Sequence, residues 1–488
     1  MWQGRYDQLY IGGQWIKPAS DGRIEVISPF TEDALGAVPD GTREDMDRAI
    51  AAAREAFDHG PWPRMPLAER KAAVARLGAQ FRAHEDTLAE LVSTEMGCPI
   101  TMSKGMQSIG ARLLIDSYLE IVDDYPFRSF RRSGTGNALV TREPIGVVAA
   151  VVPWNAPQLV TMIKIIPALL AGCTVVLKPA PETPFDAYLL AEMAAAAGFP
   201  AGVINIVPAG REIGEYLVTH PSVDKVSFTG STAAGQRIAS LCGQDLRRVS
   251  LELGGKSAAI ILDDADFDQA VEMLRTASLR NNGQVCSGKT RIVVPERHAS
   301  ELIDRIVALM DSMPIGDPLD PATQIGPLVS KRQRDRVADY LAIGQAEGAR
   351  IVRGGDRPLG LDRGWFIDPT LFVDVDRKMR IAQEEIFGPV LTVLTYKDDE
   401  DAIAIANDSA YGLNGAVFSG DFDRALGVAS RIRSGVVELN GNLVGFHAPI
   451  GGWKCSGIGR EAGLEAFDAY VECRSIGMPR EMVDALEK

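Results

Sequence analysis

The chain has 488 residues, more than one compact hydrophobic core normally holds, so we expect two or three domains. Its composition, 46% hydrophobic and 24% charged, is that of an ordinary globular protein. Lysine and arginine number 51 against 65 aspartate and glutamate residues, which gives a formal net charge of −14. A surface of this sign repels phosphate backbones and anionic membranes, so neither nucleic acid nor a membrane is an expected partner.

The six cysteines are scattered without a C-x-x-C pair, and the five histidines do not cluster. We therefore expect no metal site and no disulfide framework. The opening MWQGRYDQLYIGGQW lacks a basic segment followed by an apolar run, as an export signal would need. The most apolar tract, 165–177, is too short to cross a bilayer and contains Pro and Gly. A cytoplasmic, reducing location is the expectation.

The N-terminal region begins with strand-like pieces at 9–16 and 23–29. Thr42 and Asp45 are then spaced like a capping box before an alanine-rich helix. Helical patterns continue to about Tyr118. The polar, glycine-containing segment that follows, 127–144, predicts a projecting hairpin, and such an arm more often serves subunit contacts than catalysis.

From Gly146 onward, buried-strand runs alternate with helical patterns. Continuous Val and Ile runs are typical of strands covered on both faces, and their interleaving with helices predicts a doubly wound parallel sheet. A second alternating series begins at 257–262 and runs to 436–440, so we predict two α/β domains joined near Gly254–Gly255. The helices expected in the first series span 161–171, 185–197, 212–219 and 234–241.

Cys286 lies in the polar stretch NNGQVCSGKTR, residues 281–291. A core thiol normally sits among Leu, Val and Ala, whereas here the neighbours are polar and flexible. They can bring backbone N–H groups close to whatever the sulfur contacts. This favours Cys286 as a reactive residue, with an ordinary loop cysteine as the alternative.

The stretch FTGSTAAGQR, 228–237, follows a predicted strand and opens a helix. Gly230 and Gly235 have the spacing of a phosphate loop, but Gln236–Arg237 replace the Lys–Ser/Thr that grips phosphate and magnesium. This disfavours a nucleotide triphosphatase. Helix N-terminal N–H groups near Gly230 and Ser231 can still hold a pyrophosphate, although an ordinary strand–helix turn fits the pattern as well.

Two further strand ends carry polar groups. Glu252, in LELGGK, ends an apolar strand, where desolvation raises a carboxyl pKa toward the range useful for a general base. The alternative is an ion pair with Lys256 or an arginine. Asn155, in VVPWNAP, is a candidate donor to a developing oxyanion, although a single Asn in this position is usually structural.

In combination these motifs are far more specific. PWN, KPAPETP, FTGST, LELGGK, GQVCSG and EEIFGP occur in the order and spacing of the aldehyde dehydrogenase superfamily, which the chain resembles from about Leu9 to about Pro479. The resemblance implies NAD(P)-dependent oxidation of an aldehyde to the carboxylic acid, without acylation of CoA. It also implies a Rossmann-like dinucleotide-binding domain, a catalytic domain and a small β oligomerisation arm. The corresponding boundaries are 1–126 with 145–253, then 254–455, and 127–144 with 471–488.

The resemblance assigns roles to single residues. Cys286 matches the nucleophile, which forms a thiohemiacetal and then a thioester, and Asn155 matches the donor to the oxyanion. Glu252 matches the base that activates water. Glu461 matches a position that some members use for proton relay, with a surface ion pair as the alternative.

The cofactor implied is NAD. Pro181 stands where strongly NAD-selective members carry a glutamate that repels a 2′-phosphate, so NADP stays open. The positions that match the family's cofactor-binding residues are Val152, Trp154, Lys178, Pro181, Gly210, Gly214, Gly230, Ser231, Leu253, Glu385 and Phe387.

At positions where many members line the substrate tunnel with aromatic rings, this chain has smaller groups and neither Arg nor Lys. This predicts a wide apolar tunnel for a bulky or long aldehyde of the fatty, terpenoid or aromatic kind. One alternative is a broad-specificity or small-aldehyde dehydrogenase, if loops such as the one with Phe446 and His447 refill the space. A cysteine-dependent esterase is the alternative from a different class. A homodimer or homotetramer is expected. The tunnel positions are Ala156, Val160, Ile163, Val285, Ser287, Val444 and Ile450.

Overall fold

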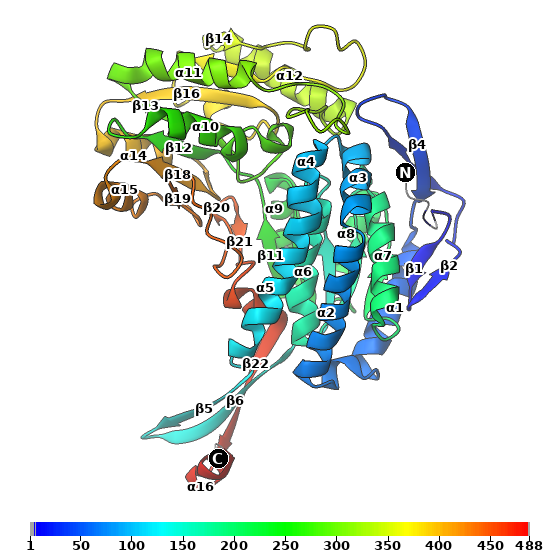
Figure 1. The fold of residues 1–488 in the computed structure, drawn as a ribbon. Coiled ribbons are helices and arrows are strands. Elements are labelled where there is room, and N and C mark those ends of the chain that lie inside the picture. The colour runs from blue at the N-terminus through cyan, green and yellow to red at the C-terminus, as the bar shows by residue number, and fades with distance from the viewer. Residues whose placement is uncertain (1–3, 5, 487–488) are drawn as a thin grey trace.

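The computed structural model describes residue 4 and residues 6–486; the remaining residues of the predicted first domain and arm (1–3, 5 and 487–488) lie outside the described part. Two separate sheets dominate the fold, each built mainly of parallel strands and covered by helices (Figure 1). The predicted α/β class is therefore confirmed. The exact domain boundaries stay a prediction.

The first sheet has the strand order β2-β1-β9-β8-β7-β10-β11-β21, in which the run from β9 to β11 is parallel. Every residue of β7 and of β8 is buried, as the continuous valine runs predicted. The strands are β1 (Leu9–Ile11), β2 (Gln14–Ile16), β7 (Val147–Val151), β8 (Thr174–Lys178), β9 (Ile204–Ile206), β10 (Lys225–Thr229), β11 (Arg248–Glu252) and β21 (Gly457–Ile458).

Helices cover both faces of this sheet. Alternate residues of β7 enter two different hydrophobic clusters: Val148 packs with α2, α5, α6 and α7, and Val147 packs with α1, α8 and α9. The sheet is thus doubly wound. Helix α6 starts at Pro157, earlier than predicted, because proline is well tolerated in a first helical turn. The helices are α1 (Arg43–Asp58), α2 (Leu67–Ala83), α3 (Glu85–Met96), α4 (Ile100–Ser103), α5 (Gly110–Ile121), α6 (Pro157–Ala171), α7 (Phe185–Ala197), α8 (Arg211–Thr219) and α9 (Thr232–Gln244), with a π-helical segment at Lys104–Ile109.

The capping box predicted before α1 is confirmed. The Thr42 side chain accepts a hydrogen bond from the Asp45 backbone N–H, and the Asp45 carboxylate accepts one from the Thr42 backbone N–H. A short antiparallel pair, β3 (Arg23–Ile27) and β4 (Ala34–Pro39), precedes this helix.

The second sheet has the order β14-β15-β16-β13-β12-β18-β19, parallel except for its edge strand β14. Its last strand is shorter than the predicted 436–440. Its strands are β12 (Ser257–Ile261), β13 (Lys289–Pro295), β14 (Arg350–Arg353), β15 (Thr370–Val373), β16 (Val390–Tyr396), β18 (Gly415–Phe418) and β19 (Glu438–Leu439). Its helices are α10 (Phe267–Ala277), α11 (Ala299–Asp311), α12 (Lys331–Ala346), α13 (Arg380–Gln383), α14 (Asp399–Asn407) and α15 (Phe422–Ala429).

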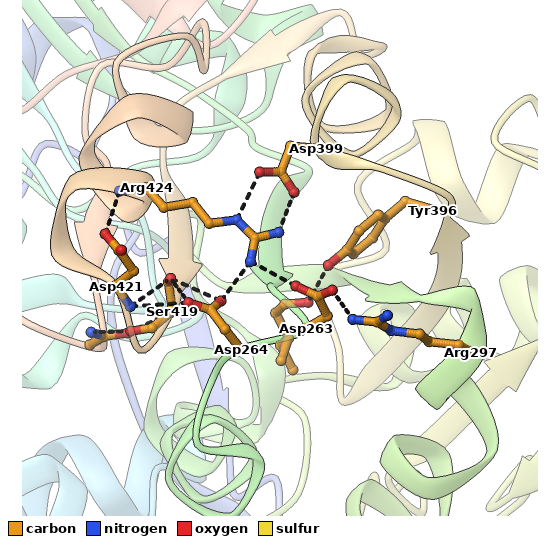
Figure 2. A network of polar contacts seen from close by, with 10 residues as sticks. Asp263, Asp264, Arg297, Tyr396, Asp399, Ser419, Asp421 and Arg424 are labelled. Carbon is orange, nitrogen blue, oxygen red and sulfur yellow. Dashed lines mark hydrogen bonds and ion pairs between the residues drawn. The ribbon is translucent and has the colours of Figure 1, made fainter.

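A polar network ties together the carboxyl ends of strands in this second sheet (Figure 2). Arg424, on α15, donates to Asp399 at the start of α14 and to Asp263 and Asp264 after β12. Asp264 in turn accepts hydrogen bonds from the Ser419 hydroxyl after β18. The Arg424 guanidinium therefore links α15 to the segments that follow β12 and β16, and Asp264 extends the network to the segment after β18.

The predicted hairpin exists as β5 (Arg128–Ser133) and β6 (Gly136–Pro144). Strand β22 (Val471–Met478) pairs along the whole of β6, and the resulting three-stranded arm projects away from both sheets with α16 (Arg480–Leu486) at its end (Figure 1). A further pair joins β17 (Tyr411–Gly412) to β20 (Trp453–Lys454). Within the described residues, no helix has the length and apolarity needed to span a membrane.

Candidate active site

A cleft of about 1430 Å³ lies where the carboxyl ends of β10 and β11 meet the amino ends of β12 and β13. Glu252 ends β11, and the short Gly254–Gly255 link leads directly into β12. The loop that carries Cys286 precedes β13. The chain connectivity thus brings the ends of both sheets to one place.

Most of the predicted site residues line this cleft. All four residues predicted for chemistry, Cys286, Glu252, Asn155 and Glu461, are among them, as are all seven predicted tunnel positions. Of the predicted cofactor positions, those that line it are Trp154, Gly230, Ser231, Leu253, Glu385 and Phe387.

The loop before Cys286 is held by buried amides in an unusual backbone conformation. Asn281 and Asn282 both have left-handed backbones, with φ of 54° and 61°. The Asn282 side chain donates to the carbonyls of Gly97 and Pro327, at 2.9 and 2.8 Å. The Gln284 side chain accepts from the Val329 backbone N–H. These long-range bonds fix the loop, and the energetic cost of the left-handed residues marks it as a functional segment.

Asn155 is part of the same network. Its Nδ2 donates to the Gln284 carbonyl at 3.0 Å, and its own carbonyl accepts from Asn281 and Gln107. The Asn155 amide is thereby anchored beside the cysteine loop. Nδ2 carries two hydrogens, so one N–H remains for a second acceptor.

The Cys286 thiol is partly exposed to the cleft. Burial raises its pKa to about 12, and the carboxylates of Glu385 and Glu252 act in the same direction. The guanidinium of Arg280 and the Ser287 backbone N–H oppose them. The thiol therefore needs further stabilisation of its anion before it can react at neutral pH.

Glu252 has the environment of a general base. Burial raises the pKa of its carboxyl well above the ordinary value, with the charge of Glu461 adding to the effect. Its Oε1 is buried without a hydrogen-bond partner among the described residues, and no ion pair joins it to Lys256. A side chain at Gly451 would approach Oε1 to 2.8 Å, so that position needs glycine.

Glu461 forms an ion pair, but a buried one, so the surface pair considered from the sequence is wrong. Its Oε1 lies 2.6 Å from Nζ of Lys164, whose side chain is fully buried in α6. Lys164 also donates to the Ser227 hydroxyl of β10. The sequence offered no sign of Lys164, because it is a single charge in an apolar helix.

Glu385 and Phe387 also line the cleft. Glu385 Oε1 accepts the Gly255 backbone N–H at 3.0 Å, and burial raises the pKa of this carboxyl. A side chain at Gly254 would come within 2.5 Å of the carboxylate, so the glycine leaves room for it. The Phe387 ring packs edge-on against Trp154, with centroids 5.3 Å apart.

The remaining predicted cofactor positions, Val152, Lys178, Pro181, Gly210 and Gly214, do not line the cleft. Lys178 is buried at the end of β8, where its Nζ donates to the Pro179 and Ala209 carbonyls, and burial lowers its pKa to about 8. A Cβ on Gly214 would lie 3.1 Å from Lys178 Cε. This group lies at the carboxyl edge of the first sheet, beside the start of α8.

These residues suit a dinucleotide. Doubly wound sheets bind such ligands at the carboxyl ends of their strands. At the end of β10 the Thr229 hydroxyl is buried without a partner among the described residues, and Ser231 caps the following helix, so the first N–H groups of α9 lie beside it. An unsatisfied hydroxyl next to a helix N-terminus suits a pyrophosphate.

Sequence reasoning missed the cations that line the cleft. They are Arg280, Lys331, Arg332, Arg336 and Arg380, although neither Arg nor Lys stood among the predicted tunnel positions. Phe446 also lines the cleft, whereas His447 contacts Glu120 on the surface, at 3.1 Å. Of the two residues considered for filling the tunnel, Phe446 and His447, only Phe446 therefore places its ring in the cleft. No group of three or more possible metal ligands occurs among the residues that the structure describes.

The chain belongs to the aldehyde dehydrogenase family, whose family model matches residues 15–476. It is 46% identical over 472 residues to geranial dehydrogenase of Castellaniella defragrans, covering 96% of this chain and 98% of that protein. A solved structure of Mycobacterium tuberculosis aldehyde dehydrogenase complexed with NAD+ superposes with a TM-score of 0.96 at 45% identity, covering 97% and 98% of the two chains. A mutant of aldehyde dehydrogenase C from Pseudomonas syringae, in complex with NAD+ and octanal, superposes with a TM-score of 0.94 at 39% identity, covering 96% of each chain.

Proposed function

We propose that the protein oxidises a long or bulky apolar aldehyde to its carboxylic acid, with NAD as the acceptor. The observation that carries this proposal is the meeting of Cys286, Asn155 and Glu252 in one cleft whose predicted tunnel positions are mostly aliphatic. Family membership supports the reaction class. The relatives named for geranial and crystallised with octanal support the apolar substrate.

In the proposed reaction, the thiolate of Cys286 attacks the aldehyde carbon and forms a carbon–sulfur bond. The resulting oxyanion accepts hydrogen bonds from Asn155 Nδ2 and from the Cys286 backbone N–H; losing one such donor typically costs about 2.7–4 kcal/mol of transition-state stabilisation. NAD, when bound, would supply the acceptor for the hydride of this carbon, so that the covalent adduct on Cys286 becomes a thioester.

Glu252 completes the reaction. As a carboxylate, it takes a proton from a water molecule, which attacks the thioester carbon and releases the acid and the thiolate. Its raised pKa makes it a better base than an exposed glutamate. The buried Lys164–Glu461 pair, whose charges act on Glu252, offers a route by which the proton leaves.

We assign the dinucleotide to two groups of residues. Lys178, Gly210 and Gly214 would hold the adenosine half, and Gly230 and Ser231 the pyrophosphate. Glu385 and Phe387 would hold the nicotinamide ribose. We favour NAD over NADP because Nζ of Lys178, the cation that could pair with a 2′-phosphate, already donates to two carbonyls.

The arm of β5, β6 and β22 suits assembly into a homodimer or homotetramer. Its strands project from the body, and most of β22 is exposed, including Ile476. An exposed strand edge of this kind is a template for pairing with a second chain. Light scattering at micromolar concentration should give a multiple of the 52.6 kDa chain mass, and a stable monomer would oppose the assignment.

The test of the reaction is Cys286→Ala, assayed with NAD and octanal. Acid formation should fall by several orders of magnitude, because the covalent step is lost, while NAD binding measured by calorimetry stays close to wild type. A cysteine-dependent esterase would instead hydrolyse esters without reducing NAD. Appreciable NADH production by the variant would refute Cys286 as the nucleophile.

A further inference from the structure

Arg280 is a cation inside the cleft without a carboxylate partner. It starts the 3₁₀ turn Arg280–Gly283 after α10, and it makes no salt bridge with any described residue. Its Nη2 donates to the Ser287 hydroxyl at 3.0 Å, while its Nε is buried without a hydrogen-bond partner among the described residues. A charged guanidinium that is partly buried without a counter-ion costs free energy. A nearby group that can become an anion is therefore expected to ionise more easily.

The carboxylate whose charge acts most on Arg280 is already engaged elsewhere. Both oxygens of Glu438 have partners: Oε2 lies 2.7 Å from Lys289 Nζ, and Oε1 accepts from Asn414 at 3.1 Å. Lys289 and Glu438 are both buried and neutralise each other. These three charged residues together therefore carry one positive charge in excess, on Arg280, which lines the cleft.

Cys286 is the group nearby that can supply the anion. Arg280 is hydrogen-bonded to the residue next to it, and both side chains line the same cleft. The other charges that act on the thiol are the carboxylates of Glu385 and Glu252, which disfavour the thiolate. The cation that acts on Glu252, Lys164, is paired with Glu461.

We propose that Arg280 stabilises the thiolate of Cys286 and that Ser287 positions the guanidinium for this task. The thiol proton leaves to water, and the negative charge on sulfur is then balanced by the excess positive charge of Arg280. Because this inference rests on the proposed role of Cys286, its test measures ionisation of the thiol and does not depend on turnover. Arg280 is thus a positioning residue that acts through the nucleophile.

The experiment measures alkylation of Cys286 by iodoacetamide in the full-length enzyme without added cofactor, as a function of pH. The exposed Cys455 and Cys473 also react, so the modified Cys286 peptide is followed by mass spectrometry. Wild type is compared with Arg280→Met and Arg280→Lys. The matched control is Arg275→Met, because Arg275 belongs to the same α10 region but bonds Glu272 at the surface.

Arg280→Met should shift the alkylation profile upward by about one pH unit, which makes the reaction about tenfold slower at a pH below both thiol pKa values. Arg280→Lys should restore most of the rate, since it keeps the charge. Arg275→Met should coincide with wild type. Ser287→Ala keeps the Arg280 charge but removes the hydroxyl that accepts its hydrogen bond, so the alkylation profile should shift upward by a smaller amount. This variant replaces Arg280→Met if Arg280→Met does not fold.

The proposal is wrong if Arg280→Met, or Ser287→Ala in its place, leaves the profile unchanged. It is also wrong if Arg280→Met changes only KM for particular aldehydes, because Arg280 would then be a substrate contact. A different failure concerns the nucleophile itself. If Cys286→Ala keeps its turnover, the proposed function fails whatever the alkylation profile, so the two failures can be told apart.

Discussion

Nζ of Lys164 lies 2.6 Å from Oε1 of Glu461, although 297 residues separate them along the chain. Both side chains are buried, at 0% and 7% exposure. The pair joins α6 to the segment that follows β21. The charges of both residues act on the Glu252 carboxyl, Glu461 raising its pKa and Lys164 lowering it.

Lys164→Met should therefore do two things. It leaves Glu461 as a buried carboxylate without its cation, which typically costs about 3–5 kcal/mol of stability. It also removes a charge that favours ionised Glu252, so the pH at which acid release reaches half its maximum should rise. Urea unfolding and the pH dependence of turnover measure the two effects.

The matched control for this change is the double variant Lys164→Met with Glu461→Gln. Because it removes both charges, it should recover most of the lost stability. A single variant as stable as wild type would mean that the buried pair contributes nothing measurable.

Glu252→Gln separates the two halves of the proposed reaction. The amide cannot accept the proton from water, whereas thioester formation does not require it. A burst of NADH comparable to the enzyme concentration should therefore appear within the first turnover, followed by a steady rate at least about a hundredfold below wild type. Stopped-flow absorbance records both phases. Release of acid at the wild-type rate would assign water activation to another group.

In the proposed reaction, the same carboxyl should set the acid limb of the wild-type pH–activity profile. Its pKa is raised, so Glu252 loses its proton only at a pH above the ordinary carboxyl range. Activity should accordingly rise with pH through this raised pKa. The limb should be absent from the residual steady-state rate of Glu252→Gln.

The fold was predictable because its signals are local. The valine runs of β7 and β8 and the capping box at Thr42 each lie within a few residues of chain, and each predicted element formed. Lys164 and Arg280 were not predictable from pattern, because their roles depend on partners brought close by folding. The role proposed for Arg280 depends on its hydrogen bond to Ser287 and on the ion pair between Lys289 and Glu438.

Arg424 provides a test of stability away from the cleft. Removing it as Arg424→Met breaks its bonds to Asp263, Asp264 and Asp399 together, which we expect to cost about 1–3 kcal/mol at neutral pH. The comparison variant is Arg431→Met. Arg431 also bridges the α14 and α15 region, but its pair with Glu400 is exposed and screened by water, so its loss should cost less stability than the loss of Arg424.

The pH dependence of the Arg424→Met effect follows from Asp263. The hydrogen bond from Arg424 holds the pKa of the Asp263 carboxyl below its usual range. Such a group stabilises the fold above its unfolded pKa, and this stabilisation is lost as pH falls through the lowered folded pKa. The difference in unfolding free energy between wild type and Arg424→Met should therefore shrink in acid, as measured by urea titrations at several pH values. A difference that grows in acid would contradict this account.

Substrate choice tests the shape of the cleft. Its predicted tunnel positions carry Ala156, Val160 and Val444 where larger rings would narrow it, so added methylene groups on the substrate can be buried. Burying one CH₂ is worth ~0.8 kcal/mol, or about fourfold in kcat/KM, until the substrate fills the space. Octanal and geranial should therefore be oxidised far more efficiently than acetaldehyde.

The matched variant Val160→Phe narrows the same space. It should reduce kcat/KM for geranial by more than tenfold while changing kcat/KM for acetaldehyde little. Equal efficiency of the wild-type enzyme with acetaldehyde and octanal would overturn the proposed substrate class. An unchanged kcat/KM for geranial in Val160→Phe would mean that Val160 does not line the substrate tunnel.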